Sequence, residues 1–293
     1  EHRSPKPSVG RSSRSSRART KAGRFIRAGF FYFPFRKTPA KLTNGYFYGK
    51  SETMKADLFV PCFIDQLYPG TAFSTLKLLR YCGVDVHYNP EQTCCGQPAF
   101  NSGYREEARS LALKFLHDFE HAETIVAPSA SCTAYIRNYY HRLLEEGSPE
   151  MDLFNRLKPR IFELTDYLVH ELKVTHFGAV FPHKVTWHDA CSALREYGIR
   201  EEPRLLLRGV EGLDLTEMED TESCCGFGGT FMVKFRHIST AMTEQKVEHA
   251  LATGAEYIAS TESSCLMNLE SYLRKNRIPL KTIHIADILA TSL

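Results

Sequence analysis

The cysteines of this chain form a pattern that occurs twice. Each copy has a single cysteine, an adjacent pair followed by glycine, and another single cysteine. The spacers are 31 and 36 residues in the first copy and 32 and 39 in the second. A pattern repeated at this length predicts two copies of one structural unit. The eight cysteines of the pattern are Cys62, Cys94, Cys95, Cys132, Cys191, Cys224, Cys225 and Cys265. The ninth, Cys82, matches Gly212 of the other copy and is interpreted as a small core or turn residue.

The sequence around the cysteines repeats as well. Short apolar runs typical of strands alternate with amphipathic stretches typical of helices, and this alternation predicts an α/β fold. We expect two tandem pseudo-symmetric units, 54–173 and 174–293, each a mainly parallel sheet flanked by helices. The matched strands are 57–62 with 184–191, 84–89 with 213–219, and 123–132 with 256–265; the matched helices are 71–83 with 201–212 and 104–121 with 234–253; the matched unit ends are 161–172 with 282–293.

All cysteines of the pattern follow predicted strands. In open parallel sheets, the loops at the carboxyl ends of the strands meet at one edge, where ligands bind. Four thiols should therefore meet in each unit.

Four interpretations of the thiols compete. Small buried hydrophobic residues would explain one isolated cysteine but not eight in register. Zinc prefers knuckles in which two nearby sulfurs face one ion, whereas adjacent residues of an extended chain point to opposite sides. A vicinal disulfide or thiol-exchange site would explain the pairs but not the distant Cys62 and Cys132. An iron–sulfur cluster, wide enough for neighbouring thiolates to bind different irons, explains all of them.

Glycines follow both cysteine pairs. Gly96 and Gly226 are predicted to form left-handed turns that leave room for a cofactor, and backbone N–H groups there would reach sulfur. Gly228 and Gly229 are candidate cofactor-binding residues for the same reason. The run GFGG lacks G-x-G-x-x-G spacing and is a weak dinucleotide signal.

A few polar residues near the pattern have two interpretations each. His188 and Asp189 either cap the following helix or act as partners or a distant ligand of the cofactor. Gln97 is more simply a solvated loop amide than part of a pocket. Asp166 and Asp287 match between the copies and are predicted to cap the last helix of each unit.

The charge of the chain is unevenly distributed. Residues 1–53 carry 13 Lys and Arg against two acids, which leaves 24 basic and 32 acidic residues in 54–293. The acidic body is an unlikely nucleic-acid binder. Residues 1–53 are expected to be a basic disordered tail. It is interpreted as a transit peptide, as an arm attracted to RNA or lipid, or as a non-native extension upstream of Met54, and the regular pattern that starts at Met54 favours the last. No apolar run is long enough for a transmembrane segment, and an odd cysteine count without a signal peptide favours a reducing, cytoplasmic compartment.

The motifs CCGQPAFNSGY, APSASC, FELTDYL, CCGFGGTFMVK and CLMN resemble the lactate utilization protein A family over nearly all of 54–293. That family is related to the cysteine-rich component of heterodisulfide reductase and to the glycolate oxidase iron–sulfur subunit, which share twin CCG domains. The resemblance implies a cytoplasmic iron–sulfur electron-transfer component of L-lactate oxidation to pyruvate, a subunit of an oxidoreductase complex. It implies one or two clusters, of the [4Fe–4S] type, held by the eight cysteines. It also implies two partner proteins, one of them a ferredoxin-like iron–sulfur protein.

The sequence departs from the full pattern of the wider CCG superfamily at one position in each unit. The wider pattern ends in CxxC, whereas this chain has Ser129 and Glu262 at the extra position, and Ser263 offers no thiol either. Four cysteines per unit would hold an ordinary [4Fe–4S] cluster, an incomplete one, or none in one unit. The alternatives are a zinc-binding non-redox subunit and a thiol-dependent reductase that uses Cys224 and Cys225. A one-electron carrier needs no general base, so no catalytic acid or base is named.

Overall fold

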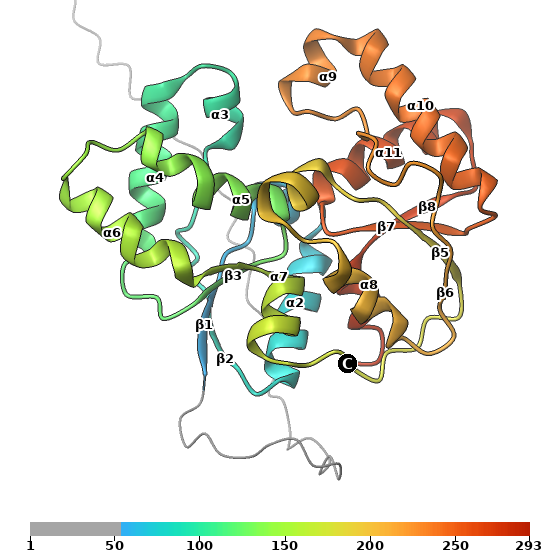
Figure 1. The fold of residues 1–293 in the computed structure, drawn as a ribbon, viewed down its shortest axis with the longest axis horizontal. Coiled ribbons are helices and arrows are strands. Elements are labelled where there is room, and N and C mark those ends of the chain that lie inside the picture. Colours follow the sequence, from blue (N-terminus) through green and yellow to red (C-terminus); the bar gives the residue numbers. More distant parts are fainter. Residues whose placement is uncertain (1–53) are drawn as a thin grey trace, which may run out of the picture. The chain divides into compact units, whose positions relative to one another are not determined.

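The computed structural model describes residues 54–293, and the expectations for residues 1–53 lie outside this part of the chain. The described residues form two four-stranded sheets with helices around them (Figure 1). Each sheet is built from one copy of the cysteine pattern. Every strand pairing in both sheets is parallel. The predicted α/β fold with two mainly parallel sheets is confirmed.

The two sheets have the same topology. The first has the order β2-β1-β3-β4 and the second the order β6-β5-β7-β8. In each sheet the chain leaves the first strand, adds the second on one side, and then crosses to the other side for the third. The strands are β1 (Lys55–Leu58), β2 (Asp85–His87), β3 (Ile125–Ala127), β4 (Ile161–Glu163), β5 (Lys184–Trp187), β6 (Asp214–Leu215), β7 (Tyr257–Ser260) and β8 (Lys281–His284).

The strand registers correct one predicted match. Lys55 pairs with Asp85, and Lys184 pairs with Asp214. Two residues before these partners, Gly83 and Gly212 have φ of 77° and 76°. Gly212 is therefore the counterpart of Gly83, and Cys82 corresponds to Glu211. Cys82 is nonetheless a small core residue, because it is buried directly after helix α2.

The predicted long helices are all present, with shorter ones between them. The matched pairs are α2 (Pro69–Tyr81) with α8 (Glu201–Arg208), α4 (Arg105–Asp118) with α10 (Arg236–Ala252), and α5 (Ala130–Tyr139) with α11 (Ser263–Asn276). The short α-helices are α1 (Cys62–Leu67), α3 (Gln97–Asn101), α6 (Pro149–Leu157), α7 (Leu164–Asp166), α9 (Thr230–Lys234) and α12 (Ile285–Leu289). Two 3-10 turns, η1 (Tyr140–Arg142) and η2 (Lys158–Arg160), and two π-helical segments, η3 (Tyr167–Glu171) and η4 (Ser192–Tyr197), complete the set.

The prediction that Asp166 and Asp287 cap the last helices is wrong. The residue before each helix does so instead: the Glu163 carboxylate accepts from the Thr165 and Asp166 N–H groups, and His284 Nδ1 accepts from Ala286 N at 3.1 Å. The two aspartates lie one turn too far along. Asp166 accepts a hydrogen bond from Tyr197 and Asp287 accepts one from Thr71, so both bind the other half of the molecule.

The two halves share a hydrophobic core. Helix α2 packs against α12, and one cluster of buried side chains includes Leu78 and Leu79 of the first half with Ile288 and Leu289 of the second. Burying these side chains stabilises each half only in the presence of the other. No helix among residues 54–293 is long and apolar enough to cross a membrane.

Candidate metal centres

The first quartet of cysteines comes together from three loops. Cys62 begins α1 just after β1, Cys94 and Cys95 follow β2, and Cys132 lies in the first turn of α5 after β3. β1 and β3 are neighbours in the sheet and are the strands at which its order reverses. The loops that leave such a switch point enclose a crevice at the carboxyl edge of the sheet.

The sulfurs of this quartet are in contact with one another. Cys62 Sγ lies 3.6 Å from Cys94 Sγ, and Cys95 Sγ lies 3.4 Å from Cys132 Sγ. The Gly96 N–H donates to Cys94 Sγ at 3.4 Å, as predicted for a backbone donor in this loop. Tyr140 OH donates to the Cys95 carbonyl at 2.8 Å and holds the backbone of the pair. The predicted convergence of four thiols is observed here.

The crowding of the thiols separates their pKa values. Hydrogen bonds from the Cys62 and Cys95 thiols and from the Gly96 N–H lower the pKa of Cys94 to about 3. The contact with Cys94, followed by burial, raises the pKa of Cys62. The contacts with Cys132 and then Cys94, followed by burial, raise the pKa of Cys95. Deprotonation of one cysteine of the quartet is therefore favourable. Deprotonation of a second is unfavourable, because like charges in a buried space repel each other. A set of several thiolates here requires a positive group among the sulfurs, which a metal ion supplies.

The second quartet has the same arrangement. Cys191 directly precedes η4 after β5, Cys224 and Cys225 follow β6, and Cys265 lies in the first turn of α11 after β7. Cys191 contacts Cys224, and Cys225 contacts both Cys224 and Cys265 through their thiol groups. These contacts and burial raise the pKa of Cys191. None of the nine cysteines, all within residues 54–293, is in a disulfide.

Gly226 shows why glycine follows the second pair. Its φ is +87°, in the left-handed region, and a Cβ there would overlap the Ser239 carbonyl oxygen and lie 2.7 Å from Thr243 Oγ1. Its N–H donates to Cys224 Sγ at 3.4 Å. Gly96 has the same role in the first half, with φ of +92° and a less crowded surrounding. Gly228 and Gly229 form the turn that enters α9, also at positive φ, and their cofactor role stays a prediction.

His188 and Asp189 do not cap the helix that follows. His188 is 1% exposed, and neither ring nitrogen has a hydrogen-bond partner among the described residues. Its ring nitrogen and the sulfurs of Cys225 and Cys265 all lie within 4.8 Å of one another. Burial, followed by the nearby Lys246 charge, lowers the pKa of His188 to about 3, so the ring is neutral.

Asp189 belongs to a buried ion pair. Arg204 of α8 donates two parallel hydrogen bonds to its carboxylate, at 3.0 and 2.8 Å, and also binds Glu217. Trp187 Nε1 donates to the same carboxylate at 2.8 Å. This pair fixes the loop that carries His188 and Cys191 against α8. Sequence reasoning missed Arg204, because it lies 15 positions from Asp189 and an arginine of an amphipathic helix is ordinarily expected on the solvated face.

Ser129 and Glu262, the two positions at which a fifth cysteine is missing, meet each other across the two halves. Ser129 Oγ donates to Glu262 Oε2 at 3.1 Å, the Ser131 N–H donates to the same oxygen at 2.9 Å, and Ser264 Oγ donates to Oε1 at 3.0 Å. Both residues are buried. The cysteine pattern identifies these positions as equivalent, but no feature of the sequence indicates that they touch.

Two aromatic rings also meet between the halves. Phe63, next to Cys62, packs edge-to-face on Phe227, which follows the second cysteine pair, with ring centroids 5.6 Å apart. Gln97, the counterpart of Phe227, is half-buried at the first position of α3. The two cysteine loops are thus neighbours, joined by apolar contact rather than by solvent.

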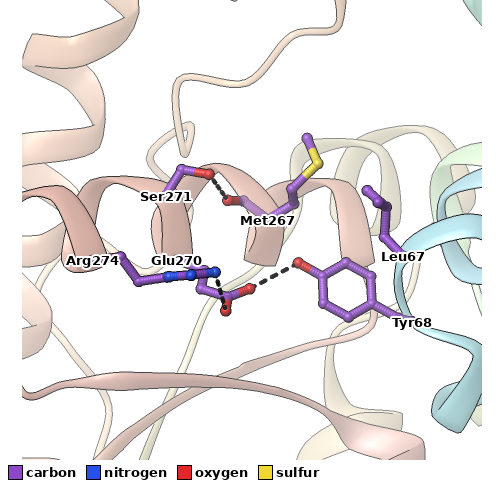
Figure 2. A pocket seen from close by; sticks show the side chains of 6 residues that line it. All are labelled: Leu67, Tyr68, Met267, Glu270, Ser271 and Arg274. Carbon is purple, nitrogen blue, oxygen red and sulfur yellow. Dashed lines mark hydrogen bonds and ion pairs between the residues drawn. The ribbon is translucent and has the colours of Figure 1, made fainter.

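A separate cavity of about 570 Å³ lies between α1 and α11 (Figure 2). Figure 2 shows Glu270 accepting a hydrogen bond from Tyr68 at 3.0 Å, with Arg274 on its other side. Burial raises the pKa of the Tyr68 hydroxyl. The cavity is lined by Leu67, Tyr68, Met267, Glu270, Ser271 and Arg274. No thiol or imidazole lines it, so the functional site is better placed at the cysteine quartets.

Comparison with known proteins agrees with this placement. The CCG family, described as a cysteine-rich domain, matches residues 56–137 and 185–270, and thus both quartets. Lactate utilization protein A 2 of Bacillus cereus (strain Q1) is 39% identical over 240 residues, covering 82% of this chain and 99% of that protein. Lactate utilization protein A of Exiguobacterium sp. is 42% identical over 234 residues, covering 79% of this chain and 95% of that protein.

Among solved structures, a hypothetical protein from Helicobacter pylori has a similar fold. The TM-score is 0.52 with 10% sequence identity, and the match covers 83% of this chain and 50% of that one. This chain thus spans about half the length of that structure, and the likeness concerns the fold alone. The twin CCG domains and the relatives that match at full length show that the chain belongs to the lactate utilization protein A family.

Proposed function

We propose that this protein is an iron–sulfur electron-transfer component of a system that oxidises L-lactate to pyruvate. The observation that carries the proposal is the presence of two thiol quartets, each half buried and half partly exposed, at equivalent sheet edges in one chain. Lactate as the fuel comes from the names of the relatives, which are lactate utilization proteins.

The donor set fits an iron–sulfur cluster in each half. In the first half the ligands would be Cys62, Cys94, Cys95 and Cys132. In the second half they would be Cys191, Cys224, Cys225 and Cys265. A cluster of the [4Fe–4S] type accepts and releases single electrons at a potential set by hydrogen bonds to its sulfurs and by burial.

The residues around the thiols have clear tasks in this proposal. The more buried cysteines, Cys95 and Cys225, are 2% and 3% exposed and keep water from that side of each site. The N–H groups of Gly96 and Gly226 donate to thiolate sulfur and stabilise negative charge on it. A one-electron carrier needs no general base, and no side chain of either site is assigned to proton transfer.

We propose accordingly that the chain works with two other proteins, one of them a ferredoxin-like iron–sulfur protein. This expectation rests on the family resemblance. An electron carrier requires a donor and an acceptor.

The decisive experiment is purification of the full chain without oxygen, with iron, acid-labile sulfide and zinc determined per chain. We expect brown protein with iron and sulfide. Colourless protein with stoichiometric zinc would favour the zinc-binding subunit, and metal-free protein that reduces disulfides would favour a thiol-dependent reductase. Either result would overturn the proposal.

Single substitutions then assign iron to each half. Cys132→Ser and Cys265→Ser should each remove about half of the bound iron, since one missing thiolate destabilises one cluster. The matched control is Cys82→Ser, which removes a buried thiol outside both quartets and should leave the iron content unchanged. Loss of the gene should abolish growth on L-lactate but not on glycolate; the opposite result would reassign the substrate.

A further inference from the structure

The imidazole of His188 is a buried polar group without a hydrogen-bond partner. It is 1% exposed, and both ring nitrogens lack a partner within the described part of the chain. Most buried polar side-chain atoms in proteins are hydrogen-bonded, and an exception calls for an explanation such as a metal ion. The neighbouring cation, in contrast, is satisfied: Lys246 Nζ donates to the Asp220 and Thr221 carbonyls.

The ring is held beside two cysteine sulfurs. The His188 backbone N–H donates to the Ala259 carbonyl at 2.9 Å, and Ser260 Oγ donates to the His188 carbonyl at 3.0 Å, so β7 fixes its backbone. In this position a ring nitrogen and the sulfurs of Cys225 and Cys265 all lie within 4.8 Å of one another. Ligands bonded to one metal ion at about 2.0–2.3 Å in tetrahedral geometry lie about 3.5–4 Å apart, so side-chain shifts of about 1 Å would suffice.

The first half has no such group. The counterpart of His188 is Phe59, which is also buried and packs edge-to-face on Phe115 and Phe119 with centroids 5.2 and 5.9 Å away. A phenyl ring meets the packing needs of this position by itself. An imidazole at the same place, left without a partner, serves a different purpose.

We propose that His188 supplies a nitrogen ligand to the metal centre of the second quartet, which therefore has five donor side chains where the first has four. The inference rests on the proposed function in that a metal centre forms there. Imidazole nitrogen is a common ligand for iron and zinc alike. A neutral imidazole supplies the fifth donor without the negative charge that a fifth thiolate would add, which keeps the reduction potential of the second centre higher than five thiolates would.

The test is pulsed EPR of the reduced, iron-loaded full chain, prepared with natural and with ¹⁵N-labelled histidine. We expect a strong nitrogen coupling that changes with the label, is absent in His188→Phe, and is retained in Phe59→Leu, a matched change at the equivalent position of the first half. His188→Phe should also release the iron of its half at least about tenfold more readily, the scale found for residues that merely orient ligands.

His188→Cys is the control for misfolding of the His188→Phe variant, because it keeps a metal-binding atom at the site. It should retain the iron of the parent protein and lose the nitrogen coupling. Iron-loaded protein without a histidine nitrogen coupling, or with one that persists in His188→Cys, would overturn the inference and leave the proposed function standing. Zinc-loaded protein would overturn the proposed function, and X-ray absorption at the zinc edge would then show whether nitrogen from His188 is bound. Protein that takes up no metal would overturn both.

Discussion

The two halves have the same sheet topology and different surroundings for their thiols. In the first half, Phe59 and Val60 precede the cysteine loop and Phe115 packs on Phe59, whereas in the second half His188 and Asp189 precede it. The second half adds Lys246, which is fully buried on α10. Aromatic rings lie behind the first site, whereas a neutral imidazole and the charged Asp189 and Lys246 lie behind the second.

This difference shows that topology and site chemistry are separable in this fold. The strand order and the glycine turns set where four sulfurs meet. The residues behind them decide the electrostatic environment, and buried charges near thiolates alter both pKa and reduction potential. Two centres in one chain can therefore have different properties without any change in the scaffold.

The largest stability effect should come from the ion pair that distinguishes the second half. Arg204→Met leaves the Asp189 carboxylate buried without its bidentate partner, and should lower the free energy of unfolding by about 3–5 kcal/mol. The counterpart in the first half, Thr75, donates a hydrogen bond within its own helix at 2.8 Å, so Thr75→Val should cost about 1 kcal/mol or less. Urea denaturation measures both. Equal losses of unfolding free energy in the two variants would show that the ion pair does not make the second half depend more on this position than the first.

The caps of α7 and α12 should give the two halves opposite pH dependence. Burial raises the pKa of Glu163 from 4.5 to about 8. The contribution of this carboxyl to the free energy of unfolding is therefore fully present below about pH 4.5 and is lost as the pH rises to about 8. Burial lowers the pKa of His284 from 6.5, so its contribution is present above about pH 6.5 and falls as the pH decreases.

Glu163→Gln should therefore remove a slope of up to about 1.4 kcal/mol per pH unit between about pH 5 and 8. His284→Asn, which keeps an acceptor for the Ala286 N–H, should flatten the curve below about pH 6.5 instead. Unfolding free energies measured across this range test both expectations. A parent curve unaffected by Glu163→Gln would mean that this carboxyl titrates normally in the folded protein.

The glycines after the cysteine pairs should differ in how poorly they tolerate a side chain. Gly96→Ala should lower stability by about 1–2 kcal/mol, the usual cost of an L-residue in the left-handed region. Steric overlap adds little, because the nearest atom to the new Cβ would be Leu111 Cβ at 3.2 Å. Gly226→Ala adds overlap with the Ser239 carbonyl, at a further cost of about 1–3 kcal/mol. Thermal unfolding of the two variants shows which of them loses more stability. A larger loss at Gly96 would contradict the closer packing of the second loop.

The smallest effect concerns the contact that joins the halves. Ser129→Ala removes the hydrogen bond to Glu262 together with the cap that Ser129 Oγ gives the Cys132 N–H, and should cost about 1–2 kcal/mol. Ser263→Ala is the control, because Ser263 Oγ is buried and has no partner among residues 54–293, so its removal should cost nothing measurable. Denaturant titrations of the two variants decide the point. Matching midpoints would argue that the Ser129–Glu262 contact contributes no stability.

Much of the fold could be predicted from the sequence. The spacing of the cysteines located the repeat, and apolar periodicity located the strands and the long helices. Helix caps were less predictable: Asp166 and Asp287 were expected to cap, but Glu163 and His284 do so. Capping depends on the backbone angles at the helix start, which periodicity does not resolve within two or three residues.

The amino-acid sequence alone was enough to group eight thiols into two sets of four, because strand–loop order places the three cysteine loops of each half at one sheet edge. The sequence left His188 with two interpretations, and which other groups join the thiols was decided only in the folded chain. His188 beside Cys225 and Cys265, Arg204 on Asp189, and Ser129 on Glu262 are contacts between distant segments. Such pairs depend on how helices pack on the sheets and on each other, and side-chain packing is set by the whole core rather than by local sequence.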